Sequence, residues 1–266
     1  VGILIGAAAL WLALRRTKAH RRNYLRSLPL SPERQAMLRR RFPLYARMPE
    51  EVRRKLDGLV NQFLDEKKFY GLEGLEVTDE RRVLVAAQAC LLIVNKPDRW
   101  YSTLETIHLY PAAFASKIRR HDGHVVIEHD AAHSGQSWDR GPVVLSWNDA
   151  AFGAANDRDG HNVVLHEFAH QLDSQTGVTD GAPLLDKEQS ASTWAKVFQD
   201  AYGRMIANLE AGRVGVLNPY GATSPAEFFA VAAEHFFEQP EALRREEPAL
   251  YEERRKYFEL DPAAWP

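Results

Sequence analysis

Apolar residues recur at helical spacing through much of the first hundred residues. Intervals of three and four residues between apolar positions predict an amphipathic helix from Pro49 to about Lys67. Ser31 as N-cap, with Pro32 at the first helical position, predicts a short helix before it. Thr78, followed by two acidic residues, begins a third helix. Its segment VLVAAQACLLIV, residues 83–94, is apolar on nearly every face and is therefore expected near the centre of the fold.

The pattern changes to short strand-like runs between residues 100 and 147. These runs are LETIHLYP, HVVIEHDA and GPVVLSW, separated by Asp-Gly and Gly-Pro pairs that are typical of turns. Helical patterns then return, over residues 161–173, 190–212, 224–240 and 248–262. The order of helices, a small mixed sheet and further helices predicts an α+β fold.

The first 14 residues, VGILIGAAALWLAL, carry no charge and are followed by the basic cluster RRTKAHRR. As a helix they would span roughly 21 Å, less than the roughly 30 Å of a bilayer core. A buried core helix and a cleaved signal peptide are alternatives, but basic residues precede the apolar run in a signal peptide. We therefore expect residues 1–26 to be a hydrophobic anchor with a basic flank. Residues 27–266 would form a cytoplasmic domain tethered to the inner face of the plasma membrane.

Composition is that of a folded globular chain, with 45% hydrophobic and 26% charged residues among 266. Lys and Arg number 34 against 36 Asp and Glu, which leaves a net charge of -2. Such a balance gives no overall basic field and argues against direct nucleic-acid binding. Cys90, the single cysteine, cannot form an internal disulfide, and its apolar surroundings in the sequence indicate a small core residue.

Candidate chemistry is concentrated in HNVVLHEFAHQLD, residues 161–173. His166 and His170 are four apart, so on a helix both imidazoles share one face and can bind one metal ion, with zinc the best match. Glu167 is displaced by about 100° around the helix axis, where it can reach a water molecule without ligating the metal. The alternative is the polar edge of a packed helix. Burying these three groups without a partner would be costly, and a metal supplies one.

A third ligand is sought downstream, where Glu227 and Glu234 are seven residues apart and share a helix face. Ser224 with Glu227 also forms a capping-box pattern, which gives Glu227 a role without metal. For Glu234, a hydrogen bond to a ligating histidine is favoured over direct ligation. Asp173 is either a residue that hydrogen-bonds a ligating histidine or an ordinary residue at a helix end. His235 is expected to pack against other residues or to lie at the surface.

Three blocks in order, GQSWDRGPVVLSW, HEFAHQLD and YGATSPAEFFAVAAEHFFE, resemble the Mlc titration factor A family of bacterial zinc metallopeptidases. The resemblance covers about residues 30–264 and leaves out the N-terminal anchor. Because the catalytic core of that family is similar to that of anthrax lethal factor, a gluzincin, the resemblance implies a zincin-like metallopeptidase domain.

The resemblance also implies roles for particular residues. His166, His170 and Glu227 would hold one Zn²⁺ per chain, and Glu167 would be the general base. Tyr220 matches a tyrosine thought to stabilise the oxyanion, although a turn residue after an Asn-Pro pair is the alternative.

Three functions of different kinds follow from these observations. The first is a zinc peptidase acting on a peptide or protein substrate, aligned along GPVVLSW as an edge strand, with exopeptidase and endopeptidase action both open. The second is a non-catalytic binding factor that sequesters a transcriptional repressor such as Mlc, the partner that the resemblance implies. A membrane-tethered adaptor is a third possibility, and it rests on residues 1–26 alone.

Overall fold

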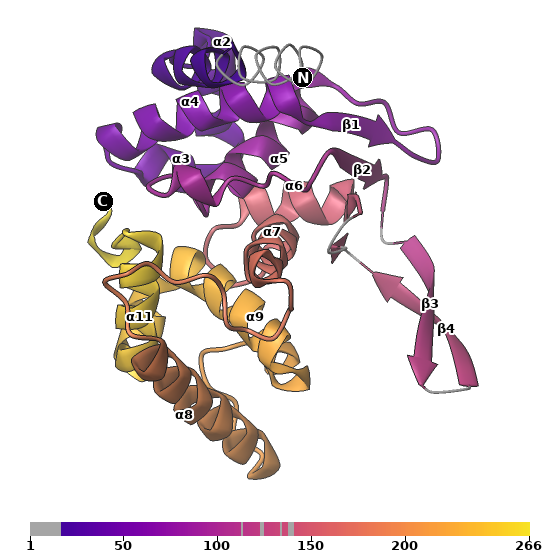
Figure 1. Ribbon diagram of the computed structural model, residues 1–266, viewed down its shortest axis with the longest axis vertical. Helices are drawn as coiled ribbons and strands as arrows, with labels where there is room; N and C mark the ends of the chain where they lie inside the picture. Colours follow the sequence, from indigo (N-terminus) through magenta and orange to yellow (C-terminus); the bar gives the residue numbers. More distant parts are fainter. Residues whose placement is uncertain (1–16, 113, 123–124, 134, 138–140) are drawn as a thin grey trace, which may run out of the picture.

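Helices make up most of the fold of the computed structural model, which describes residues 17–112, 114–122, 125–133, 135–137 and 141–266 (Figure 1). The numbered helices are α2 Pro32–Arg41, α3 Pro43–Arg47, α4 Glu50–Glu66, α5 Asp79–Leu91, α6 Trp147–Ala155, α7 Val163–Asp173, α8 Ala191–Glu210, α9 Pro225–Glu238, α10 Pro240–Glu246 and α11 Pro248–Phe258. In Figure 1, α7 lies between a layer formed by α2 to α5 and a second layer formed by α8, α9 and α11.

Helix starts follow the capping residues expected from the sequence. The Ser31 side chain accepts from the Arg34 N–H at the start of α2, and Thr78 accepts from the Arg81 N–H at the start of α5. These bonds satisfy N–H groups that the first helical turn leaves free. A helix that the sequence pattern missed, α6, begins at Trp147 because Ser146 caps it.

The main sheet has four strands in the order β1-β2-β6-β5. Its strands are β1 Lys68–Gly71, β2 Thr106–Tyr110, β5 Gly135–Ser137 and β6 Val143–Ser146. Strands β1, β2 and β6 run parallel, and β5 pairs with β6 antiparallel. The sheet is therefore mixed. A separate antiparallel pair consists of β3 Phe114–Asp122 and β4 Val125–His133.

The expectation that GPVVLSW forms an edge strand is wrong. Its strand, β6, lies between β2 and β5, and all four of its residues are buried. A strand that is covered on both faces has apolar residues at consecutive positions, and this pattern is typical of the interior of a sheet. On this side of the sheet the edge strand is β5, which contacts α7.

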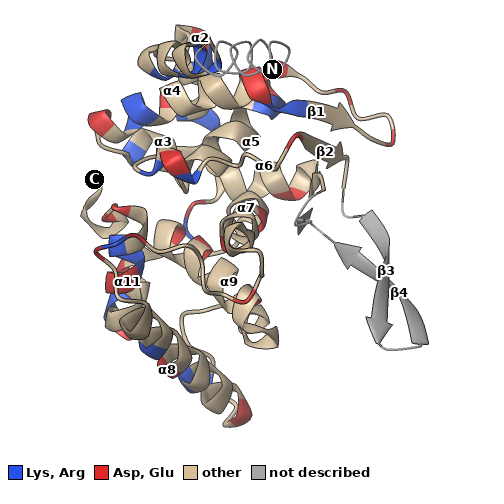
Figure 2. Cartoon of the chain, viewed as in Figure 1, with Lys and Arg blue, Asp and Glu red and all other residues tan. Residues whose placement is uncertain are grey.

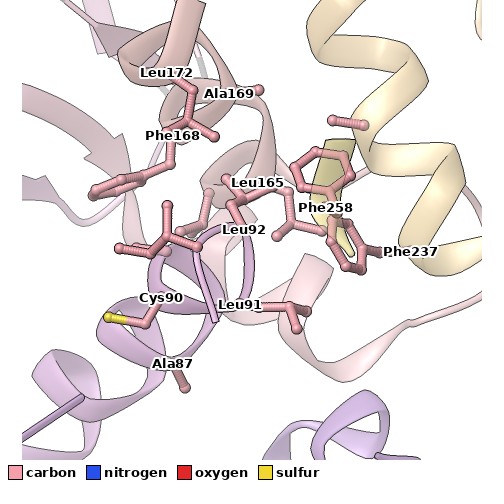
Figure 3. Packing of buried hydrophobic residues seen from close by; sticks show 14 of the residues in the cluster. Ala87, Cys90, Leu91, Leu92, Leu165, Phe168, Ala169, Leu172, Phe237 and Phe258 are labelled. Atoms are coloured by element: carbon pink, nitrogen blue, oxygen red, sulfur yellow. The ribbon is translucent and has the colours of Figure 1, made fainter. Parts of the chain in front are cut away.

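The buried hydrophobic residues that the structure describes form one core, which includes the apolar residues of α7. Phe168 has no exposed surface, and its ring centroid lies 4.9 Å from that of Tyr101 and 5.8 Å from that of Phe63. Figure 3 shows Leu92, at the end of α5, beside Leu165 of α7. Cys90 is free and fully buried, as expected. The helix that carries both histidines is therefore held rigidly by packing on several sides.

Residues 17–27 form a helix that lies against α4. Arg21 pairs with Asp65, and Arg22 pairs with Glu66 at 2.6 Å. Figure 2 shows opposite charges next to one another in this region. Part of the predicted basic flank therefore contacts the body of the protein.

No helix in the described part of the chain combines the length and apolar character needed to cross a membrane. The predicted anchor, residues 1–14, lies outside the described residues, so the anchor and the tethering stay predictions.

Candidate metal centre

Asn162 starts α7 and ties its first turn to α9. Its side-chain oxygen accepts from the N–H groups of Val164 and Leu165, at 3.1 and 3.0 Å. Its backbone N–H donates to Glu234 at 2.5 Å, and its side-chain amide donates to Glu238 at 3.0 Å. The position and rotation of α7 are thus set by the carboxyl groups of two glutamates of the neighbouring helix.

Three side chains from these two helices meet at one point. Nε2 of His166 lies 2.9 Å from Oε2 of Glu227, and Nε2 of His170 lies 3.2 Å from Nε2 of His166. The remaining distance, from Nε2 of His170 to Oε2 of Glu227, is 3.4 Å. Among the residues that the structure describes, these form the one cluster able to offer three ligand atoms to a metal ion. The structure therefore brings together the three residues proposed from the sequence.

The spacing of these atoms fits zinc. Ligands about 2.0–2.1 Å from a tetrahedral Zn²⁺ lie about 3.3 Å from one another, close to the three observed distances of 2.9, 3.2 and 3.4 Å. Two imidazoles and one carboxylate are also a ligand set that catalytic zinc uses. The residues present therefore fit a zinc ion without rearrangement of the backbone.

Glu234 contacts the opposite side of the His166 ring. Its Oε1 lies 2.8 Å from Nδ1 of His166, and the carboxylate is almost fully buried. If Nδ1 donates this bond, Nε2 presents a lone pair toward the Glu227 carboxylate, and two acceptors need a proton or cation between them. Burial acts to lower the pKa of His166, but Glu234 and Glu227 outweigh burial and raise it well above its usual range. The site thus favours positive charge at this point.

Glu227 owes its position to the start of α9. Ser224 accepts from the Glu227 N–H at 3.2 Å, which is half of the predicted capping box. The Glu227 carboxylate points to the histidines. Burial acts to raise its pKa, but the hydrogen bonds to His166 and His170 prevail and hold the pKa well below its usual range. The carboxylate is therefore ionised, as a metal ligand must be.

Glu167 and Tyr220 border the cluster. Glu167 is 6% exposed, and burial raises its pKa to about 7, while the neighbouring histidines act to lower it. A carboxylate with a pKa near the working pH suits a general base. Tyr220, in the short helix Pro219–Thr223, is 54% exposed, and its ring centroid lies 6.0 Å from that of His166. Its pKa is raised, chiefly by burial, so the phenol keeps its proton and can donate a hydrogen bond.

The other residues singled out in the sequence have structural contacts. Asp173 accepts from the Gly181 N–H at 2.7 Å and so supports the loop after α7. His235 is buried and bonded to the Val231 carbonyl at 2.9 Å, which confirms a packing role. The sequence reasoning missed Asn162 and Glu238. An Asn directly before an apolar helical run is a capping signal that could have identified Asn162.

Comparison with known proteins gives the class of this protein. The family described as glucose-regulated metallo-peptidase M90 matches residues 15–259. An uncharacterized protein of Synechocystis is 42% identical over 236 residues, which cover 88% of this chain and 86% of that protein. Mlc titration factor A of Klebsiella pneumoniae is 32% identical over 225 residues, covering 83% of this chain and 84% of the relative. The chain therefore belongs to the M90 metallo-peptidase family, together with Mlc titration factor A.

Proposed function

We propose that the chain is a zinc-dependent peptidase of the gluzincin type, with residues 27–266 as its metallopeptidase domain. The observation that carries the proposal is the convergence of His166, His170 and Glu227 within zinc-ligand spacing, next to the buried Glu167. A purely structural zinc site would have four protein ligands and no need for an adjacent base.

The mechanism assigns each side chain one task. His166, His170 and Glu227 would hold the ion, and Glu234 would keep the His166 ring in the orientation and tautomer for ligation. When bound, zinc would polarise the scissile carbonyl and lower the pKa of a water molecule. Glu167 would accept a proton and return it to the leaving amine.

Two further features would position the substrate. The Tyr220 phenol, whose ring lies near that of His166, would donate a hydrogen bond to a developing oxyanion. Strand β5, at the edge of the sheet and in contact with α7, offers backbone groups along which a peptide can pair as an added strand. A substrate paired in this way would lie beside the helix that carries Glu167.

The test is Glu167→Gln, which keeps size and polarity but removes the base. Zinc content, measured by atomic absorption, should stay at one ion per chain, while peptide hydrolysis falls roughly 100-fold or more. Glu210→Gln, the same substitution at an exposed position of α8, should leave both unchanged. Hydrolysis by Glu167→Gln at the wild-type rate would refute the mechanism.

A second candidate function is supported by the name of the relatives, Mlc titration factor A. In this alternative the chain binds and sequesters a repressor such as Mlc without cleaving it. Equal binding of the repressor by the wild type and by Glu167→Gln, with no hydrolysis of any peptide by either, would favour this alternative.

A further inference from the structure

A cavity of about 510 Å³ lies between the loop after α7, helix α8 and the start of α9. Its volume is within the range of roughly 300–1,000 Å³ that small-ligand pockets have. Its walls are chiefly apolar and aromatic, and include Leu184, Trp194, Phe198, Tyr202, Pro225 and Phe228. Among the described residues that line it, Asp180 alone is charged. The cavity therefore favours an apolar occupant.

The cavity and the candidate metal centre share the first turn of α9. Pro225 and Phe228 line it, and Glu227 lies between them in the sequence. Because consecutive Cα atoms are about 3.8 Å apart, the Cα atoms of Pro225 and Glu227 lie within about 7 Å. The first turn of α9 therefore carries both a wall of the cavity and a residue of the candidate metal centre.

The aromatic wall is preorganised. The rings of Trp194 and Phe198 are stacked, with centroids 4.5 Å apart and an interplanar angle of 15°. Behind them, the buried Arg254 guanidinium lies 4.9 Å from the Phe198 centroid and donates to the Phe229 carbonyl at 2.6 Å. Such a wall does not need to order itself when an apolar group binds, which reduces the entropic cost of binding.

The loop wall is also fixed, at Gly181. Its N–H donates to Asp173 at 2.7 Å, and its carbonyl accepts from the Trp194 indole at 3.4 Å. Its φ of +81° favours glycine, and an added Cβ would lie 2.6 Å from the Pro225 carbonyl oxygen. Asp173, at the end of the helix that carries His170, thus holds one wall of the cavity against the start of α9.

We propose that this cavity is the specificity pocket of the enzyme and takes an apolar side chain, such as that of leucine, from the peptide substrate. The inference rests on the proposed peptidase function, because the occupant is a part of the molecule bound at His166, His170 and Glu227. Half-exposed Leu184 lines the pocket and would cover the bound side chain.

The experiment compares peptides that carry Leu, Gly or Asp at one position at a time around the scissile bond. Binding is measured by calorimetry with Glu167→Gln, and kcat/KM is measured with the wild type. At one position, the peptide with Leu should have an affinity and a kcat/KM about 10- to 100-fold higher than those of the peptide with Gly. Ala195→Trp, at an exposed position of α8 that lines the pocket, should fill it and abolish the preference.

Matched controls distinguish the pocket from general effects. Ala207→Trp is the same change at an exposed position of α8 away from the pocket, and it should keep the preference. Leu184→Asp should reduce the preference for Leu at least about 10-fold, whereas Val178→Asp, at another exposed apolar position outside the pocket lining, should not.

The outcomes separate the pocket from the chemistry. A Leu preference in binding without any cleavage would support the pocket and refute the peptidase function. Cleavage with no side-chain preference, or with a preference that survives Ala195→Trp, would overturn the pocket and leave the peptidase function standing. Absence of both binding and cleavage would overturn the pocket as a substrate site.

Discussion

Three glutamates on α9 contact α7 in different ways, so one substitution made at each position can separate their roles. Glu227 reaches Nε2 of both histidines. Glu234 bonds Nδ1 of His166 and the Asn162 N–H. Glu238 bonds the amide of Asn162 and the His161 N–H, and lies one turn further along α9. We predict that Glu→Gln weakens zinc binding most at 227, less at 234 and least at 238.

The loss at Glu227 should be the largest because Gln replaces an ionised ligand with a neutral amide. Outer partners of metal ligands typically contribute about 10- to 100-fold in affinity, so removal of a ligand itself should cost more than about 100-fold. In the metal-free protein the same change replaces the charged acceptor that both histidines share with a neutral amide.

The loss at Glu234 follows from its two hydrogen bonds, at 2.8 Å to His166 and 2.5 Å to Asn162. A Gln side chain has one oxygen, so one of the two N–H groups would face an amide NH₂ group. A hydrogen bond to a charged group contributes about 1.5–3 kcal/mol, which corresponds to roughly 10- to 150-fold in an equilibrium constant. Glu238→Gln, which has no contact with a ligand, should change zinc affinity by less than about 10-fold.

The assay is competition for zinc against a chelating indicator, with circular dichroism to establish that each variant is folded. A greater loss for Glu234→Gln than for Glu227→Gln would move the third ligand to Glu234. Equal losses of zinc affinity for Glu234→Gln and Glu238→Gln would refute the idea that the orientation of the His166 ring contributes to zinc binding.

Three other predictions concern stability, each measured by urea unfolding. Burial raises the pKa of Glu238 to about 9, against 4.5 for an ordinary glutamate; the Asn162 hydrogen bond opposes the shift and the charge of Glu234 reinforces it. Between these values the folded state holds a proton that the unfolded state has released, so stability should fall from about pH 5 to pH 9. When unfolding is measured in the presence of a metal chelator, Glu238→Gln should flatten this dependence of stability on pH. An unchanged dependence would contradict the assignment of the raised pKa to Glu238. Asn162→Ala should cost about 1–2 kcal/mol through loss of the α7 cap, and a change below about 0.5 kcal/mol would show that the cap contributes little. Phe168→Ala should cost about 3–5 kcal/mol because the ring is fully buried. Phe152→Ala, at a position 56% exposed, should cost much less, and equal costs would contradict the core assignment.

Local features of this chain could be predicted from the sequence alone. The shared face of His166 and His170 follows from the helix repeat, and the caps at Ser31 and Thr78 follow from side-chain oxygens next to free N–H groups. The burial of Cys90 followed from its apolar neighbours. Each of these depends on residues a few positions apart, whose relative placement is set by backbone geometry.

Placement over long sequence separations was decided by the tertiary structure. The pattern allowed both Glu227 and Glu234 as ligands, and the crossing of α9 over α7 placed one at Nε2 and the other at Nδ1 of the same ring. Strand order likewise put β5, not β6, at the edge of the sheet. Side chains 61 residues apart meet at the candidate metal centre, because the burial of α7 between helices from both ends of the chain determines which faces come together. Spacing along one segment carries no information about that packing.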